Sequence, residues 1–139
     1  MKLDVYFIDA FADKVFTGNP AAVIFTDIDD EKLMQKIASE NNLSETAFVN
    51  LTKDTNYIRW FSPLKEVDLC GHATLASGFV YFNFINKDEN EVTFMSASGE
   101  LSVKRNDDLY ELNFPKDNLI KIDLKDQVAD SIGVKPIET

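Results

Sequence analysis

The 139-residue chain carries 14 Lys and Arg against 24 Asp and Glu, a formal net charge of −10 at pH 7. This length fits one domain of about 100–150 residues, or one domain with part of another. A chain this acidic repels phosphate groups, which argues against nucleic acids and anionic membranes as partners. Apolar residues make up 45% of the chain, enough for a buried core.

Cysteine and histidine each occur once, as Cys70 and His72. One cysteine excludes an internal disulfide, and two such residues cannot fill a four-ligand structural zinc site. We therefore expect a metal-free protein. An acidic residue, Asp4, follows the start at once, which is unlike a secretory signal peptide, and no apolar stretch is long enough to cross a bilayer. These features predict a cytoplasmic protein.

The N-terminal half predicts strands around one amphipathic helix. Alternating apolar residues predict a strand over 3–10, and the sequence Thr-Gly-Asn-Pro at 17–20 predicts a turn before a short strand at 21–25. Asp27, Asp29 and Asp30 offer N-caps for a helix over 31–40, and Asn41-Asn42 suits its C-terminal end. Two strands are then expected over 46–51 and 57–61.

The segment over 71–86 is apolar on nearly every side, with small residues first and aromatic residues after them. Such a pattern predicts a helix buried within the surrounding sheet. Three further strands are expected after it, over 91–95, 100–104 and 110–114. Together these elements form an α+β unit.

The character of the sequence changes after Pro115. Asp123 can cap a helix that runs to Ile132, where Gly133 would end it. We therefore expect a first lobe over 1–115, and a linker with the start of a truncated second lobe over 116–139.

Three places in the sequence are candidates for chemistry, each with a structural alternative. Glu45 lies between a helix end and an apolar strand, where a partly desolvated carboxylate can serve as a base, or it is a capping or turn glutamate. Gly71-His72 opens a helix whose free N–H groups can bind a carboxylate, or it is an ordinary buried helix start. Cys70 is a thiolate favoured by the same helix end, or a packing residue.

Four groups of residues stand in order along the chain. They are Gly18-Asn19-Pro20 with Ala22-Val23, Ser44-Glu45-Thr46-Ala47-Phe48, Arg59-Trp60-Phe61, and Glu66-Val67-Asp68-Leu69-Cys70-Gly71-His72-Ala73-Thr74-Leu75-Ala76. In this order and spacing they resemble the phenazine-biosynthesis PhzF-like family, and Phe114-Pro115 resembles the closing mark of that family's first domain. The resemblance covers the whole chain.

The resemblance implies a diaminopimelate-epimerase-like fold, in which two similar lobes each wrap a mixed or antiparallel sheet around a central buried helix. It implies a cleft between the lobes where Glu45 and His72 are catalytic, moving a proton on a small carboxylate-bearing substrate without a cofactor. In phenazine synthesis that step isomerises trans-2,3-dihydro-3-hydroxyanthranilic acid. The implied substrate-binding positions are Gly18, Asn19, Pro20, Ser44, Cys70, Gly71 and Ala73.

The family's second lobe carries a Gly-Asp loop and a Thr-Gly-Ser helix start that this sequence does not contain. Three functions follow as hypotheses. The first is a PhzF-like isomerase or epimerase domain, completed in a homodimer that sets one first lobe against another. The second is a catalytically silent lobe that serves as a binding or assembly module. The third is a racemase that uses Cys70, which would need two chains to supply an acid and a base.

Overall fold

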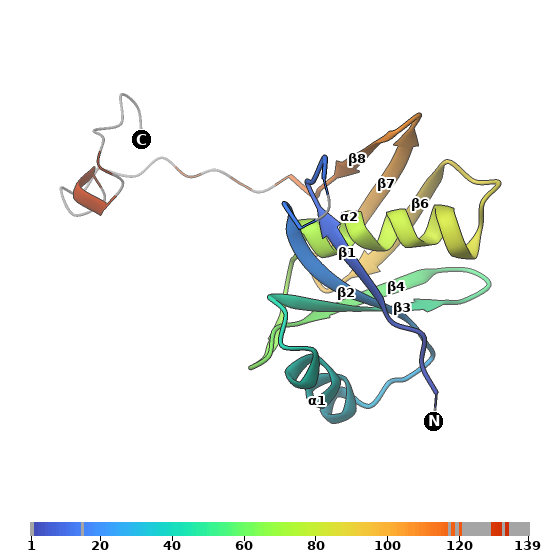
Figure 1. The fold of residues 1–139 in the computed structure, drawn as a ribbon, viewed down its shortest axis with the longest axis horizontal. Helices are drawn as coiled ribbons and strands as arrows, with labels where there is room; N and C mark the ends of the chain where they lie inside the picture. Colours follow the sequence, from blue (N-terminus) through green and yellow to red (C-terminus); the bar gives the residue numbers. More distant parts are fainter. Residues whose placement is uncertain are drawn as a thin grey trace.

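The sheet and its central helix are the main features of the computed structural model, which describes residues 2–14, 16–116, 118, 120, 129–131 and 133. The helix α2 (Gly71–Val80) continues without a break into a π-helical turn, η1 (Tyr81–Ile85). Both lie inside a curved sheet (Figure 1). Within the described residues this sheet has eight strands, in the order β1-β2-β3-β4-β6-β7-β8 with β5 paired to β4. The fold is therefore the α+β lobe expected from the sequence, with a sheet wrapped round a buried helix.

The strands run in mixed directions. Their bounds are β1 (Tyr6–Ala10), β2 (Asn19–Phe25), β3 (Glu45–Leu51), β4 (Asn56–Phe61), β5 (Glu66–Val67), β6 (Glu91–Ser96), β7 (Gly99–Asn106) and β8 (Leu109–Asn113). The pairs β2–β3 and β4–β6 are parallel, and the other pairs are antiparallel. Each parallel pair needs a crossover: α1 (Glu31–Asn41) joins β2 to β3, and the α2 segment joins β4 to β6.

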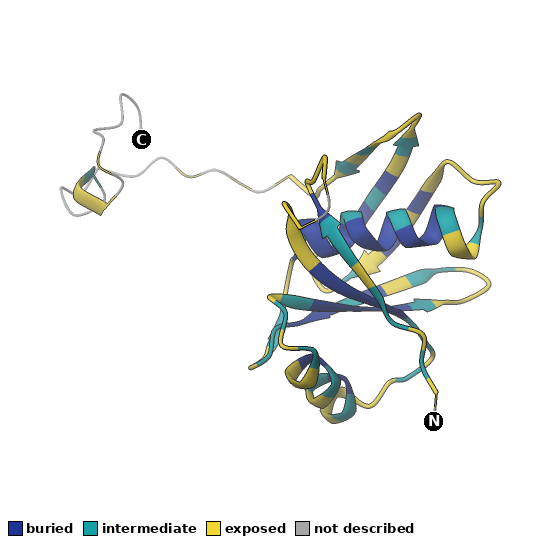
Figure 2. Ribbon diagram, in the orientation of Figure 1, coloured by how far each residue is buried: buried dark blue, intermediate teal, exposed yellow. Residues whose placement is uncertain are grey.

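The larger core lies between the inner face of the sheet and α2. Figure 2 shows α2 as the most continuously buried element, and it packs against β1, β2, β3, β7 and β8. Phe82, Trp60 and Phe94 are the largest fully buried side chains of this core, and each is at most 1% exposed. Small residues on α2 let the strands come close: a Cβ added at Gly78 would overlap the Val103 side chain of β7.

A second, smaller core lies between α1 and the outer face of the sheet, around Met34, Phe48 and Phe61. The Asp30 carboxylate caps α1 by accepting hydrogen bonds from the Lys32 and Leu33 amides at 3.0 and 3.2 Å. Asn42 ends the helix in the left-handed conformation, at φ 50°. Both ends of this helix agree with the sequence prediction.

Four local features differ from the sequence prediction or fall outside it. Strand β2 begins at Asn19, two residues earlier than expected, and includes Pro20. Proline has no N–H to donate, but pairing of β2 with β3 starts only at Ala21, so no hydrogen bond to β3 is lost at Pro20. The end of the predicted helix is η1, where the Asn86 amide donates to the Tyr81 carbonyl at 2.8 Å. The two-residue strand β5 was not predicted. Of the helix expected over 123–132 only residues 129–131 are described, and they are helical; the rest of that helix and most of the segment over 116–139 lie outside the described residues.

Candidate active site

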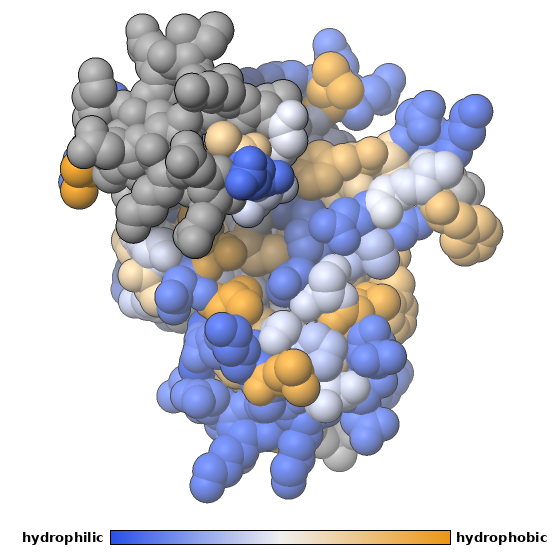
Figure 3. Space-filling model, turned by 90° about the vertical axis from the view of Figure 1, so that its left-hand side faces the viewer, coloured by the Kyte–Doolittle hydropathy of each residue, from blue (hydrophilic) through white to orange (hydrophobic). Residues whose placement is uncertain are grey.

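The N-terminal end of α2 meets the first residues of β2 and β3 at one end of the lobe. Glu45 is the first residue of β3, and its register partner on β2 is Ala21, directly after Pro20. His72 is the second residue of α2. Figure 3 looks onto this end, where apolar side chains show between polar ones. Residues from three of the sequence groups therefore come together here.

Glu45 and His72 are adjacent although 27 positions separate them. The Glu45 Oε2 and His72 Nε2 atoms lie 3.3 Å apart, which is ion-pair distance, but their geometry does not form a hydrogen bond. The Glu45 side chain is 20% exposed and the His72 side chain 9%. Burial lowers the pKa of His72, whereas the Glu45 charge and the Pro20 carbonyl act against that decrease. His72 is therefore a neutral imidazole at pH 7.

Cys70 is the N-cap residue of α2 and completes the group. Its Sγ lies 3.4 Å from His72 Nδ1. Burial raises the pKa of the thiol to about 11; the Ala73 amide opposes this increase and the Glu45 carboxylate adds to it. The helix end therefore does not produce a thiolate at pH 7, and the thiol lacks the depressed pKa typical of a catalytic cysteine.

The first turn of α2 offers backbone donors beside this group. Cys70 forms no regular side-chain cap on the turn, although its thiol lies near the Ala73 amide, so among the described residues the amides of Gly71 and His72 have no capping side chain. Ala73, one of the predicted substrate-binding positions, is fully buried, backbone included. A Cβ at Gly71 would come 2.8 Å from Cζ of Phe114, so the Phe114 ring lies against the start of α2. In the sequence, Phe114 indicates only the end of a lobe.

The other predicted binding residues border the group. The Ser44 hydroxyl lies 3.3 Å from Asn19 Oδ1 and 3.4 Å from the Pro20 carbonyl oxygen, which ties the start of β2 to the start of β3. Gly18 has a structural requirement, since a Cβ there would collide with the Ala10 carbonyl oxygen. The loop before it contains Phe11 and Phe16, both at positive φ and exposed to 72% and 93%.

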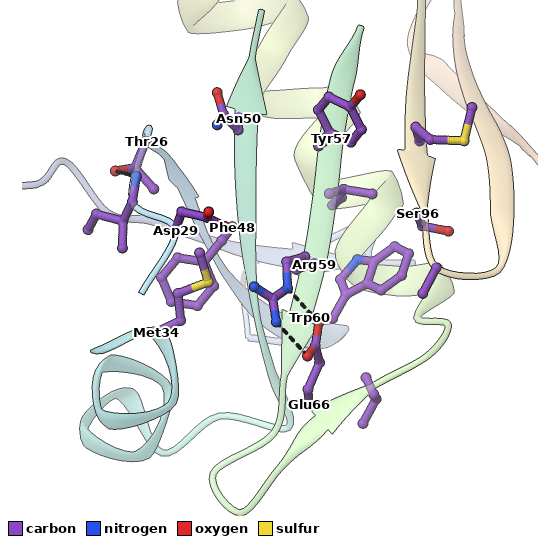
Figure 4. A pocket seen from close by; sticks show the side chains of 15 residues that line it. Thr26, Asp29, Met34, Phe48, Asn50, Tyr57, Arg59, Trp60, Glu66 and Ser96 are labelled. Carbon is purple, nitrogen blue, oxygen red and sulfur yellow. Dashed lines mark hydrogen bonds and ion pairs between the residues drawn. The ribbon is translucent and has the colours of Figure 1, made fainter. Parts of the chain in front are cut away.

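A sizeable cavity among the described residues lies elsewhere. It measures about 540 Å³ and lies on the outer side of the sheet, between α1, β4 and β6 (Figure 4). In it the Arg59 guanidinium donates two 2.7 Å hydrogen bonds to the Glu66 carboxylate and one of 3.2 Å to Glu31. These carboxylates raise the pKa of Arg59 above its usual range. The ion pair fixes β5 to β4. In the sequence, the only sign of this contact was the opposite charge of Arg59 and Glu66.

Comparison with known proteins identifies the family. Residues 8–133 match the PhzC-PhzF family, described as phenazine biosynthesis-like protein. The chain belongs to this family. It is 45% identical to an uncharacterized isomerase of Pseudomonas aeruginosa over 99% of its own length and 54% of the isomerase.

Solved structures of PhzC/PhzF and epimerase proteins have the same fold. A PhzC/PhzF phenazine-biosynthesis protein of Clostridium difficile matches with a TM-score of 0.84 and 48% identity, over 99% of this chain and 53% of that one. A predicted epimerase of P. aeruginosa, at 24% identity, shares the fold with a TM-score of 0.64 over 78% of this chain and 41% of its own. The chain thus spans about half the length of these PhzC/PhzF relatives. Among the described residues, no helix combines the length and apolar character needed to cross a membrane.

Proposed function

We propose that this lobe takes part in the isomerisation of a small carboxylate-bearing substrate, with Glu45 as the acid and base that moves a proton. The observation that carries the proposal is the approach of Glu45 to His72 beside the uncapped first turn of α2. The name of the P. aeruginosa relative, an isomerase, supports the same class of reaction.

The substrate carboxylate would bind at the start of α2. The amides of Gly71 and His72 have no capping side chain among the described residues, and the positive end of the helix dipole favours an anion. Because His72 is neutral, it does not compete with the helix end for the substrate carboxylate. The Phe114 ring against Gly71 supplies an apolar wall for the carbon skeleton. This orientation would place an acidic C–H of the substrate near the Glu45 carboxylate.

The proton transfer balances without a further reactant. The Glu45 carboxylate takes a proton from one carbon while that C–H electron pair moves into the neighbouring π system. The protonated Glu45 then returns the proton to another carbon of the same substrate. His72 keeps Glu45 in place through the 3.3 Å contact and is itself fixed by Cys70 at Nδ1.

The test is deuterium uptake from D₂O into dihydro-hydroxyanthranilate and related amino or hydroxy acids. Glu45→Gln keeps the size of the side chain but removes the base, so exchange should fall about 10²–10⁴-fold. Glu40→Gln, an exposed glutamate on α1, is the matched control and should exchange at the wild-type rate. Equal exchange by Glu45→Gln, with its fold intact, would favour the binding or assembly module instead.

We further propose that the lobe acts as a cytoplasmic homodimer. The support is the loop before β2, where Phe11 and Phe16 expose 72% and 93% of their surface next to the site. Sedimentation at micromolar concentration should find a dimer that Phe16→Ser weakens. A monomer across that range contradicts the dimer without bearing on Glu45.

A further inference from the structure

Glu45, Cys70 and His72 form the one group in the described part of the chain whose side chains could together hold a metal ion. Each offers a ligand atom, and the three atoms all lie within 4.8 Å of one another. Cys70 and His72 are 7% and 9% exposed, and Glu45 is 20% exposed. The group is thus enclosed on the protein side and reachable from the side where the substrate would bind.

A second observation comes from His72 itself. Its Nε2 atom is buried and makes no hydrogen bond to any described residue, although Glu45 Oε2 lies 3.3 Å away. Buried polar atoms nearly always have a partner. A neutral imidazole nitrogen without one, next to a carboxylate oxygen, is a free ligand atom facing a second ligand atom.

The spacing fits a tetrahedral site. Zn²⁺ lies roughly 2.0–2.3 Å from its nitrogen, oxygen and sulfur ligands, which puts neighbouring ligands roughly 3.3–3.7 Å apart. The Nε2–Oε2 separation of 3.3 Å has this length. The Cys70 Sγ now contacts Nδ1 at 3.4 Å, and rotation of the Cys70 side chain would replace that contact with a bond to the metal.

The donor set selects the type of metal. One thiolate, one imidazole and one carboxylate are the ligands of zinc and of similar borderline-soft cations, whereas magnesium and calcium prefer oxygen alone. Three protein ligands leave the fourth position open. A metal-free protein was expected from the sequence because Cys70 and His72 cannot fill a closed site with four ligands. The group of Glu45, Cys70 and His72 is instead an open site with three ligands.

We propose that Glu45, Cys70 and His72 bind one Zn²⁺-like cation per chain, and that the bound cation blocks proton transfer because it occupies the Glu45 carboxylate. Binding releases the thiol proton of Cys70 to solvent and involves no redox change. The inhibition rests on the proposed function, whereas the binding itself does not.

The binding test uses Co²⁺ and Zn²⁺ alone with the full chain. Co²⁺ should bind at one equivalent and show a thiolate-to-metal charge-transfer band with strong tetrahedral visible bands, and Zn²⁺ should displace it. Cys70→Ser should abolish the charge-transfer band. Glu45→Gln should keep the band but weaken Co²⁺ binding at least about tenfold, and Glu40→Gln should change neither. Circular dichroism of each variant establishes that it is folded.

Three results would overturn the binding proposal: no stoichiometric binding, a band that persists in Cys70→Ser, or equal affinity in Glu45→Gln. The inhibition is tested separately by deuterium exchange with Zn²⁺ and with EDTA. Stoichiometric Co²⁺ binding in a chain that exchanges no proton under EDTA would refute the proposed function and leave the metal site standing. Exchange that Zn²⁺ does not slow would refute the inhibition.

Discussion

Replacing Phe82 by alanine tests whether the helix inside the sheet is the axis of the fold. Phe82 lies in η1 and is 0% exposed. Its ring stacks on Tyr110 at a centroid distance of 6.2 Å, and the Arg105 guanidinium lies over it at 5.5 Å. The truncation would leave a cavity bordered by residues from several strands, which cannot collapse without moving the sheet.

The expected loss is about 4 kcal/mol of unfolding free energy, within the range for buried Phe→Ala substitutions. The same substitution at Phe84, two residues along the same turn, is the matched control. Phe84 is 55% exposed, and its ring centroid lies 5.0 Å from that of Tyr6. Its truncation should therefore lower the unfolding free energy by only about 1 kcal/mol.

Urea unfolding of the full chain, followed by circular dichroism, measures both losses. Since whole domains are stable by only about 5–15 kcal/mol, Phe82→Leu serves as a milder variant with an expected loss of about 1–1.5 kcal/mol. Equal losses at Phe82 and Phe84 would refute the assignment of this helix as the buried axis.

Three further predictions concern single residues. In EDTA, the unfolding free energy should decrease as pH falls below 6.5, because unfolded His72 then takes up a proton that the folded imidazole, with its lowered pKa, does not. Urea titrations from pH 7 to 5 should show a shallower decrease of the unfolding free energy in His72→Gln, and an identical slope in the two proteins would contradict the reasoning. Raising the pKa of Cys70 from 9.0 to about 11 leaves about 100-fold less thiolate at pH 8. Iodoacetamide should therefore alkylate the folded chain at least about 100-fold more slowly than the unfolded chain, and comparable rates would contradict the raised pKa. Gly78→Ala should lower the melting temperature, with a loss of about 1–3 kcal/mol, because its Cβ overlaps Val103 although alanine favours helices; a higher melting temperature would show that the helix can shift.

Local sequence determined most of the elements and the ends of α1. Alternating apolar residues mark β6 and β7, whose inward side chains are buried, and Asp30 caps α1 through hydrogen bonds to residues two and three positions away. The uninterrupted apolar character of 71–86 predicted a buried helix, which the structure confirms in α2 and η1. Each of these features depends on interactions between near neighbours or on a simple period, and a sequence displays both directly.

The tertiary structure decided how the candidate site is assembled. No local pattern in the sequence places Glu45 beside His72, and only the resemblance to the PhzF-like family implied that they share a site. The parallel pairing of β2 with β3 and the packing of α2 inside the sheet bring them to 3.3 Å. The same packing favours the second of the two alternatives for Cys70, a packing residue, because burial outweighs the Ala73 amide in setting the pKa of its thiol. Burial and through-space charge depend on residues far apart in the chain, so only the folded chain determines which polar atoms lose water and which gain a partner.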